Sequence, residues 1–599
     1  MFTLPSGLPA WAGALLLLAV PAAAQASFLE PYLVKDLAPG PASSVPGDFA
    51  PAGNLLYFTM DDPEALMPSP TKSGRWVAVT DGVKDGSGTH LLLVSTEGHS
   101  KSVIEGLSNS LYEYVLGAQG AGVYFGTKED SASGTDSKLW YGTEAGAAFI
   151  TSFPGSIPGG PGRWRLSDDL MYFLRGSQSG NRLYRTDGTP FGTTIIDSCL
   201  PPPAETPFGI SLGNGKTAGG GAGVNQALVF PTMGNSGLWS TVGLGGAPSP
   251  PCANKLMSGT FFEVEAMGGL YFALSGGGVG GTISGLWKTD GTSTPVLIAP
   301  FSGGMSGMTS HGDKLYFVAD DGFGLTSRLW VSDGNTVAPV PGSPVGSDLD
   351  VNQWAIVGNT AFIPNGSSPW MHRLDLSSGQ MLSAVTGDSL NYACAGIKGP
   401  VVAGGLLFSM AWKSPKYVIT VYNPAKEKLE LVPAADYGIS YSAGDWLEAA
   451  GNKVYFQGSN SATGQELWAI EVPSAEEVVR LGSPANPAAL EPGLTSGPVL
   501  GKTWDPYVDH SSFLPTATVD VLGLSAAQVN VPLPPHGTLL CDPAALVVDL
   551  QVVAAGTPFA LPIPNDTSLL GLTLCAQAGS IHALGMQLTN ALDITLGVE

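Results

Sequence analysis

The feature that most constrains the fold of this chain is a recurring aromatic strand. A Phe, preceded by Tyr in most copies, returns along the first three quarters of the chain in steps of 42 residues (Phe230 to Phe272) up to 67 residues (Phe58 to Phe125). The copies are Phe58, Phe125, Phe173, Phe230, Phe272, Phe317, Phe362, Phe408 and Phe456. Periods of roughly 40 to 50 residues are typical of repeat architectures whose units complete one another's core.

A second strand with its own aromatic residue follows most of these copies, and a turn rich in Asp, Gly and Thr follows the strand. The aromatic residues are Trp76, Trp140, Tyr184, Trp239, Trp287, Trp330 and Trp468, and the units around Phe362 and Phe408 lack this half. Short apolar runs alternate with turn residues and show no helical period, which predicts about four strands in each unit. We therefore predict an all-β chain, with a β-propeller of about eight or nine four-stranded blades and the aromatic residues packed between blades. An N-terminal strand is one way to close the last blade.

Composition supports many short strands and excludes some partners. The chain has 81 Gly and 48 Pro, as expected of tight turns between strands. Its formal net charge is −23 with only 26 Lys and Arg residues, so we expect neither nucleic acid nor an anionic membrane surface as a partner.

The first residues predict export. Residues 1–26 contain the apolar run WAGALLLLAV, the helix breaker Pro21 and an A-x-A pattern at Ala24 to Ala26, which together indicate a signal peptide, although no Lys or Arg precedes the run. No later segment is apolar enough to span a membrane. We expect a secreted protein, either extracellular or at the cell surface.

Five cysteines fit an oxidising compartment. Cys541 and Cys575 lie in one C-terminal segment and form a possible disulfide, Cys199 and Cys252 form a second possible pair, and Cys394 is left over. Their spacing matches no zinc pattern.

The stretch RLYRTDGTPFGT, from Arg182 to Thr193, could bind a ligand or could be only a turn. The same phrase returns around Asp290-Gly291 and Asp333-Gly334, which favours a structural turn. We predict that Asp187 accepts backbone N–H bonds of the turn and that Gly188 takes a positive φ.

Several phrases together resemble the ELWxxDGT repeat family of secreted bacterial proteins. They are LVKDLAPGPASSVPG (residues 33–47), KLYFVADDG (314–322), GQELWAI (464–470) and TDGTPFGT (186–193). The resemblance covers about residues 30 to 475. It implies a propeller-like array with no established general activity.

The repeat stops before the C-terminus. We predict the propeller over 27–475, a Pro- and Ala-rich linker over 476–486 and a small β-sandwich over 487–599, where apolar and polar residues alternate. The ending, LPIPNDTSLLGLTLCAQ through LTNALDITLG, resembles a C-terminal module common on secreted bacterial proteins. That resemblance implies an accessory or surface-associated role without catalytic residues.

Catalytic motifs are weak in this sequence. Gly209, Ser211 and Gly213 match the G-x-S-x-G pattern, but one such match is expected by chance in a chain so rich in Gly and Ser, and the motif needs a strand-to-helix turn. The histidines are scattered without metal-ligand spacing. They are His90, His99, His311, His372, His510, His536 and His582. We therefore predict no catalytic residues and no organic cofactor.

The loops between the two aromatic strands are acidic and would share one face of a propeller. Their acidic residues are Asp61, Asp62, Glu64, Glu129, Asp130, Asp136, Asp320 and Asp321. Oxygen-rich loops can bind calcium, although none of these has the order of a calcium-binding loop, and solvated acidic loops are the commoner case. Calcium is thus a possible cofactor.

Two functions fit these patterns. The first is a secreted, non-enzymatic binding or structural protein that presents a propeller face to an extracellular protein or glycan, since every strong signal is architectural. The second is an extracellular carbohydrate-active hydrolase of the sialidase or glycosidase type, because a propeller can place two carboxyl groups over its central channel.

Overall fold

The structure is a computed structural model of the chain. It describes residues 29–38, 43–61, 75–84, 87–91, 114–131, 134–154, 164–166, 171–177, 180–195, 227–232, 237–242, 253–258, 261–267, 270–275, 283–301, 304–320, 327–346, 349–365, 371–387, 393–394, 400–413, 416–432, 438–439 and 447–599. These residues form two compact units, one made of 30–422 and 428–470 and the other of 423–427 and 471–599.

The larger unit begins with antiparallel sheets in which consecutive strands are neighbours. The first three sheets are β2 (Gly47–Ala52), β3 (Leu55–Asp61), β4 (Arg75–Thr80) and β5 (His90–Leu91); β6 (Tyr114–Gln119), β7 (Gly122–Ser131), β8 (Gly134–Thr143) and β9 (Gly146–Pro154); and β10 (Trp164–Leu166), β11 (Met171–Ser177), β12 (Gly180–Thr186) and β13 (Thr194–Ile195). The next three are β14 (Ala227–Thr232), β15 (Gly237–Val242) and β16 (Ala253–Ser258); β17 (Phe261–Met267), β18 (Leu270–Ser275), β19 (Gly285–Thr289) and β20 (Val296–Pro300); and β21 (Met305–His311), β22 (Lys314–Asp320), β23 (Ser327–Ser332) and β24 (Val337–Pro339).

The remaining strands of this unit are hydrogen-bonded into one longer array. A 3-10 helix, η3 (Val351–Gln353), precedes β25 (Ala355–Val357), β26 (Thr360–Pro364), β27 (Met371–Asp375) and β28 (Gln380–Gly387). Then come β29 (Ala393–Cys394), β30 (Val401–Ala403), β31 (Leu406–Lys413), β32 (Lys416–Asn423), β33 (Lys428–Leu431), β34 (Gly438–Ile439), β35 (Glu448–Ala450), β36 (Lys453–Asn460) and β37 (Gly464–Glu471). The strand nearest the N-terminus, β1 (Tyr32–Lys35), pairs antiparallel with β37.

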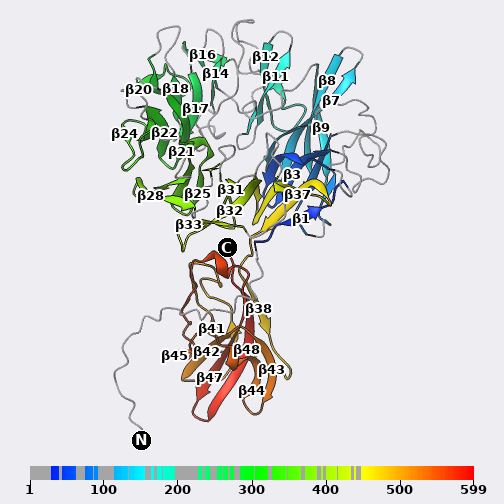
Figure 1. Cartoon of the computed structure of the whole chain (residues 1–599), viewed down its shortest axis with the longest axis vertical. Helices are drawn as coiled ribbons and strands as arrows, with labels where there is room; N and C mark the ends of the chain where they lie inside the picture. Colours follow the sequence, from blue (N-terminus) through cyan, green and yellow to red (C-terminus); the bar gives the residue numbers. More distant parts are fainter. Residues whose placement is uncertain are drawn as a thin grey trace. The chain divides into compact units, whose positions relative to one another are not determined.

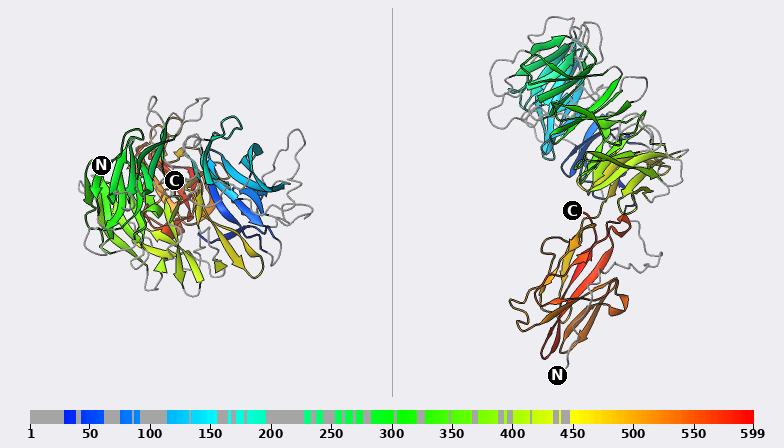
Figure 2. Two further views of the ribbon diagram at one scale, coloured as in Figure 1. Left: turned by 90° about the horizontal axis from the view of Figure 1, so that it is seen from above. Right: turned by 90° about the vertical axis from the view of Figure 1, so that its left-hand side faces the viewer.

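Most of the first strands of these sheets contact the first strand of the next sheet, and the last of them returns to the first. Strand β2 contacts β6, β6 contacts β10, β14 contacts β17, and β17 contacts β21. Further along the chain β25 contacts β30, β30 contacts β35, and β35 returns to β2. Sheets whose inner strands follow one another around an axis make a β-propeller. The predictions of an all-β chain and of a propeller are therefore confirmed (Figures 1 and 2).

The propeller core lies between successive sheets, because each sheet has two apolar faces and covers only its neighbours. One cluster joins Tyr57 and Val79 of the first sheet to Phe125 and Trp140 of the second. Another joins Tyr124 and Leu139 of the second sheet to Met171, Phe173 and Tyr184 of the third. Full burial of one such side chain stabilises the fold by about 1.5–3 kcal/mol.

The smaller unit is built on a five-stranded sheet with the order β38-β48-β47-β42-β45. Its strands are β38 (Glu476–Arg480), β42 (Val519–Ser525), β45 (Gln551–Ala554), β47 (Thr573–His582) and β48 (Gly585–Thr595). Three strand pairs complete the unit: β39 (Leu490–Glu491) with β41 (Tyr507–Val508), β40 (Thr503–Trp504) with β46 (Leu561–Pro562), and β43 (Gln528–Leu533) with β44 (Gly537–Cys541). Two 3-10 helices, η4 (Pro543–Ala545) and η5 (Thr567–Leu569), lie in its connections.

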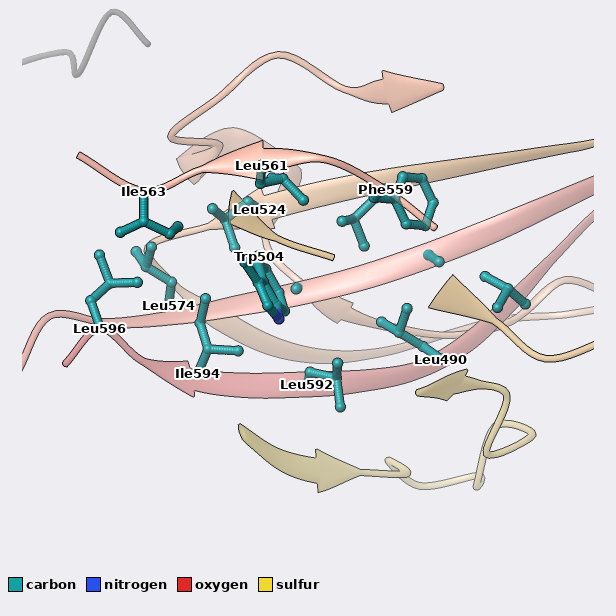
Figure 3. Close-up of a cluster of buried hydrophobic side chains, with 14 of the residues drawn as sticks. Leu490, Trp504, Leu524, Phe559, Leu561, Ile563, Leu574, Leu592, Ile594 and Leu596 are labelled. Carbon is teal, nitrogen blue, oxygen red and sulfur yellow. The ribbon is translucent and has the colours of Figure 1, made fainter. Parts of the chain in front are cut away.

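The core of the smaller unit surrounds Trp504, whose side chain has no exposed surface. Leu574, Leu592 and Ile594 from the five-stranded sheet face Leu490 and Leu561 from the short strand pairs (Figure 3). The unit therefore has two layers with one apolar core between them.

The predicted linker differs from the structure. Residues 476–480 form β38, all five of which pair antiparallel with β48, and the C-terminal stretch of the smaller unit begins at Glu471. Strand β38 lies at the edge of the sheet, and its Val478 and Val479 are 56% and 48% exposed. A short, charged edge strand has no buried alternation to distinguish it from a linker, which explains the error.

Among the described residues, no helix is long and apolar enough to cross a membrane. The predicted signal peptide over 1–26 lies outside the described residues.

Candidate functional site: the Asp-Gly turns and the neighbouring faces

The two recurring aromatic residues are cross-strand partners in four of the units. Phe125 lies opposite Trp140, and Phe173 lies opposite Tyr184. Ring centroids of these pairs are 6.4 Å and 5.4 Å apart, with the rings stacked. Phe230 with Trp239, and Phe317 with Trp330, are paired in the same way. The recurrence in the sequence is thus a repeated cross-strand pair.

In the second sheet, the Tyr and Phe of the first aromatic strand pack on opposite faces. Phe125 packs against the first sheet, whereas Tyr124 packs against the third sheet. The alternation of side chains along a strand produces this division, so a single Tyr-Phe pair fills two gaps between sheets.

The other repeat residues follow the pattern with local shifts. In the sheet β17 to β20, Trp287 lies opposite Ala273, and Phe272 is one position earlier and packs toward the following sheet. Phe58 lies opposite Ala78, while Trp76 lies opposite Met60. Phe456 is on β36, and Trp468 is on β37 beside β1.

Each Asp-Gly turn closes on itself through its carboxylate. Asp290 accepts hydrogen bonds from the backbone N–H groups of Thr292 (2.8 Å) and Ser293 (2.7 Å). The N–H of Ser293 and then that of Thr292 lower the pKa of Asp290 to about 2. Asp187 accepts from the N–H of Thr189 at 2.9 Å and from its hydroxyl at 2.6 Å. These carboxylates therefore accept hydrogen bonds from residues of their own turns.

Asp333 closes its turn in the same way, by accepting from Asn335 and Thr336 at 2.8 Å and 2.7 Å. Sequence reasoning missed one further member, Asp375, which accepts from Ser377 and Ser378. Hydrogen bonds from these serines lower the pKa of Asp375 to about 2. The signal was available, since Asp-x-Ser-Ser-Gly can form the same turn without an Asp-Gly pair.

The glycines of the turns lie against the preceding sheet. Gly188 has φ of 86°, and a Cβ atom there would lie 3.1 Å from the hydroxyl oxygen of Tyr124 in the sheet before it. Gly334 also has φ of 86°, and a Cβ atom there would lie 3.3 Å from the ring of Phe272. Gly291 shares the positive φ, at 82°. We call the line of contacts between each turn and the preceding sheet the turn seam.

Polar contacts reinforce the turn seam. The ammonium group of Lys288 donates to the carbonyl oxygen of Gly334 (2.7 Å) and to the side-chain oxygen of Asn335 (2.9 Å). Outside the turn seam, Tyr57 donates from its hydroxyl to the carbonyl oxygen of Ala121, in the turn between β6 and β7 of the next sheet, at 2.8 Å. Burial, with smaller contributions from Glu144 and Tyr141, raises the pKa of Tyr57 to about 12.

The structure places the acidic loops only in part. Asp320 accepts from the N–H of Gly304 at 2.8 Å and from the hydroxyl of Ser327 at 2.7 Å. Glu129 and Asp136 occupy opposite positions where β7 and β8 meet, with Asp130 beside them, and Asp61 ends β3. Asp62, Glu64 and Asp321 lie outside the described residues.

No group of three or more His, Cys, Asp or Glu side chains able to hold a metal ion occurs among the residues that the structure describes. The calcium prediction is not tested by this, because Asp62, Glu64 and Asp321 lie outside those residues. The G-x-S-x-G residues Gly209, Ser211 and Gly213, together with His99, Cys199 and Cys252, also lie outside them.

The histidines that can be placed do not converge. His90 is on β5, His311 on β21, and His372 on β27, where burial lowers its pKa. His536 and His582 are in the smaller unit, and His536 has a ring nitrogen 2.8 Å from the carbonyl oxygen of Met586.

Three side chains of structural importance were not identified from the sequence. Arg373 is buried between sheets and donates to the hydroxyl of Tyr422 at 3.0 Å. In the smaller unit, Arg480 donates to both carboxylate oxygens of Asp593, from Nε at 2.7 Å and from Nη2 at 3.0 Å. A third, Glu466, is completely buried on β37.

Cys541 and Cys575 are joined by a disulfide with Cα atoms 5.6 Å apart. Arg480 donates to the carbonyl oxygen of Leu540 and to the sulfur of Cys575, each at 3.1 Å. The arginine thus ties β38, part of the expected linker, to the disulfide.

A buried aspartate paired with a partly exposed histidine stabilises another part of the smaller unit. His510 Nε2 lies 3.1 Å from both carboxylate oxygens of Asp520, which has no exposed surface. Ser580 donates its hydroxyl to the same carboxylate at 2.6 Å. Because the serine contacts the aspartate and not the histidine, the three residues do not form a nucleophilic triad.

No protein-family model matches the sequence, and no curated protein matches it. Solved structures match at low similarity. One is a prolyl endopeptidase that is 12% identical to this chain, with a TM-score of 0.33. The match covers 65% of this chain and 56% of the endopeptidase. The β-propeller domain of the Trilobed protease from Pyrococcus furiosus is 9% identical over 66% of this chain and 99% of that domain, with a TM-score of 0.30.

Oligopeptidase B from Trypanosoma brucei is 16% identical over 64% of this chain and 56% of its own, with a TM-score of 0.33. Similarity this low says nothing about activity. The propeller assignment rests on the sheets of this chain itself.

Proposed function

We propose that this protein is a secreted, non-enzymatic binding or structural protein that uses a repeat propeller of the ELWxxDGT type as an interaction scaffold. The successive groups of strands from β2 to β37 support nine blades, with β1 added to the last group. The two layers of the smaller unit support an attached β-sandwich.

The observation that carries this proposal is the use made of the repeated polar residues. The carboxylates of Asp187, Asp290 and Asp333 are hydrogen-bonded within their own turns. The glycines that follow Asp187 and Asp333 lie so close to the preceding sheet that an added Cβ atom would be within 3.4 Å of it. Residues that recur for chemistry would point toward a shared ligand, whereas these recur because every blade needs the same closure.

We therefore expect a partner to be recognised by exposed side chains that lie on the turns but take no part in closing them. Phe191 is 98% exposed within the turn from Arg182 to Thr193, and it is a candidate contact for an extracellular protein or glycan. The acidic loops are the alternative face, and their carboxylates would bind a ligand through calcium.

The test is a glycan array and a pull-down from culture medium with the full chain, each with and without a calcium chelator. We expect a retained ligand whose binding falls at least threefold in Phe191→Ser while the melting temperature is unchanged. The matched control is Leu584→Ser, which removes a side chain that is 92% exposed in the other unit. If the chelator abolishes ligand binding and Phe191→Ser binds as the wild type does, the binding site would be assigned to the acidic loops and not to Phe191.

The same incubations distinguish the hydrolase. Release of reducing sugar or of sialic acid from an array glycan, in proportion to the amount of the chain, would contradict the non-enzymatic proposal. Retention of intact ligand supports it.

A further inference from the structure

The five-stranded sheet of the smaller unit has two edges, and only one of them is charged. At one edge, three of the five residues of β38 carry charge, namely Glu476, Glu477 and Arg480. At the other edge, β45 has the sequence Gln-Val-Val-Ala, with neither a charged residue nor a proline. Charged residues and prolines commonly protect a sheet edge against pairing with another chain. The edge at β45 lacks that protection.

The backbone of β45 presents hydrogen-bonding groups at this edge. The N–H of Ala555 donates to the carbonyl oxygen of Thr518 at 3.2 Å, which fixes the phase of the ladder between β45 and β42. Successive residues of a strand alternate in the direction of their N–H and C=O groups, so those of Val553 face β42 and those of Val552 point away from it. Among the described strands, none pairs with β45 on that side. A further strand can therefore be added there.

The side chains at the same edge are apolar and exposed. Val552 and Leu550 are 63% and 55% exposed. Val552 lies opposite Val521 of β42, and a Cβ atom added to Gly523 would lie 3.3 Å from a methyl carbon of Leu550. Both side chains lie on the face opposite to the core, because Leu522, between Val521 and Gly523, belongs to that core. An apolar row on the outer face thus reaches the edge of the sheet.

We propose that β45 is the interface of a homodimer, in which the β45 strands of two copies pair antiparallel around a two-fold axis at Val552. In a two-fold interface the same strand contacts itself, so the register has to be self-complementary. An axis at Val552 pairs this residue with its own counterpart and pairs Leu550 with Ala554 of the second copy. The paired residues are apolar, and they share one face of the sheet. The two five-stranded sheets then form one continuous sheet.

Charge favours a second copy of the chain as the occupant of this edge. The net charge of −23 makes two copies repel one another on average, so they can associate only where this repulsion is small. Strand β45 is uncharged, and the proposed register places Asp549, the nearest acidic residue in the sequence, opposite Ala555 of the second copy. An uncharged apolar strand offers nothing that selects an acidic or a basic peptide, whereas it matches itself.

The experiment is sedimentation equilibrium of the full chain over a series of protein concentrations. We expect a reversible monomer–dimer equilibrium in the micromolar range, since a small interface is typical of weak association. Val552→Lys places two cations opposite each other at the axis and should weaken dimerisation roughly tenfold. The matched control is Val478→Lys, the same change at a valine that is 56% exposed at the other edge. This control should dimerise as the wild type does.

A cross-link tests the register independently, and it decides the matter if Val552→Lys does not fold. Directly opposite residues of a hydrogen-bonded pair have Cα atoms about 5.5 Å apart, which a disulfide can span. Under mild oxidation Val552→Cys should therefore form a covalent dimer, whereas Leu584→Cys, at a side chain that is 92% exposed, should not exceed the wild type.

Three results would overturn the proposal. The first is a wild type that stays monomeric at every concentration. The second is a dimer that Val478→Lys dissociates and Val552→Lys does not, because the other edge would then be the interface. The third is equal cross-linking of Val552→Cys and Leu584→Cys, because random collision would then account for it.

Discussion

At the scale of single residues, the buried polar side chains described above hydrogen-bond to residues of different elements and so hold those elements together. Asp520 of the smaller unit is completely buried and holds His510, Ser580 and the N–H of Gly556 at once. A buried carboxylate is tolerated only with such partners. Burial disfavours a charge on His510, but its hydrogen bonds to Asp520 and Phe513 outweigh this and raise the pKa of the histidine above 6.5.

A pH dependence of the smaller unit follows from this pair. Because the folded pKa is raised, the stabilisation is fully present below pH 6.5 and is lost as the pH rises through the folded value. We expect the free energy of unfolding to decrease over that interval. Chemical denaturation from pH 5 to 8 measures it, with His510→Gln as control. A wild type that parallels His510→Gln at every pH would refute the role of the pair.

At the scale of elements, the turn seam explains why Asp and Gly recur together. Asp closes the turn, while Gly supplies both the positive φ and the space that lets the turn reach the preceding sheet. Either residue alone would leave the turn open or hold it away from its neighbour.

Two glycine variants separate these requirements. Gly53 has φ of 62° and nothing within 4 Å of an added Cβ, whereas Gly188 also meets Tyr124. We expect Gly53→Ala to cost about 1 kcal/mol of unfolding free energy, from the backbone alone, and Gly188→Ala about 2 kcal/mol. Denaturant titrations compare the two. Equal costs would mean that the contact with Tyr124 contributes nothing.

At the scale of the whole molecule, the repeat could be predicted because it is periodic and local. Phe125 and Trp140 lie fifteen positions apart on adjacent strands, and the two aromatic residues are close in sequence in the other complete units too, from 9 positions (Phe230 and Trp239) to 18 positions (Phe58 and Trp76). The long-range polar contacts could not be predicted. Glu466 accepts from Leu37, and Arg480 donates to Asp593, and these residues are far apart in the sequence and come together only in the folded chain. The strand β38 was missed because its exposed edge residues show no buried alternation and because its partner β48 is the last strand of the chain.

The central claim is that the repeated Asp and Gly residues of the turns are structural and do not themselves bind the ligand. The most direct test is Asp187→Ala, which removes the acceptor for Thr189 N–H, with stability and binding to the captured ligand measured on the same sample. We predict that the unfolding free energy falls by about 1 kcal/mol and that affinity changes less than twofold. An unchanged melting temperature together with abolished binding would contradict the claim and place Asp187 in the binding site.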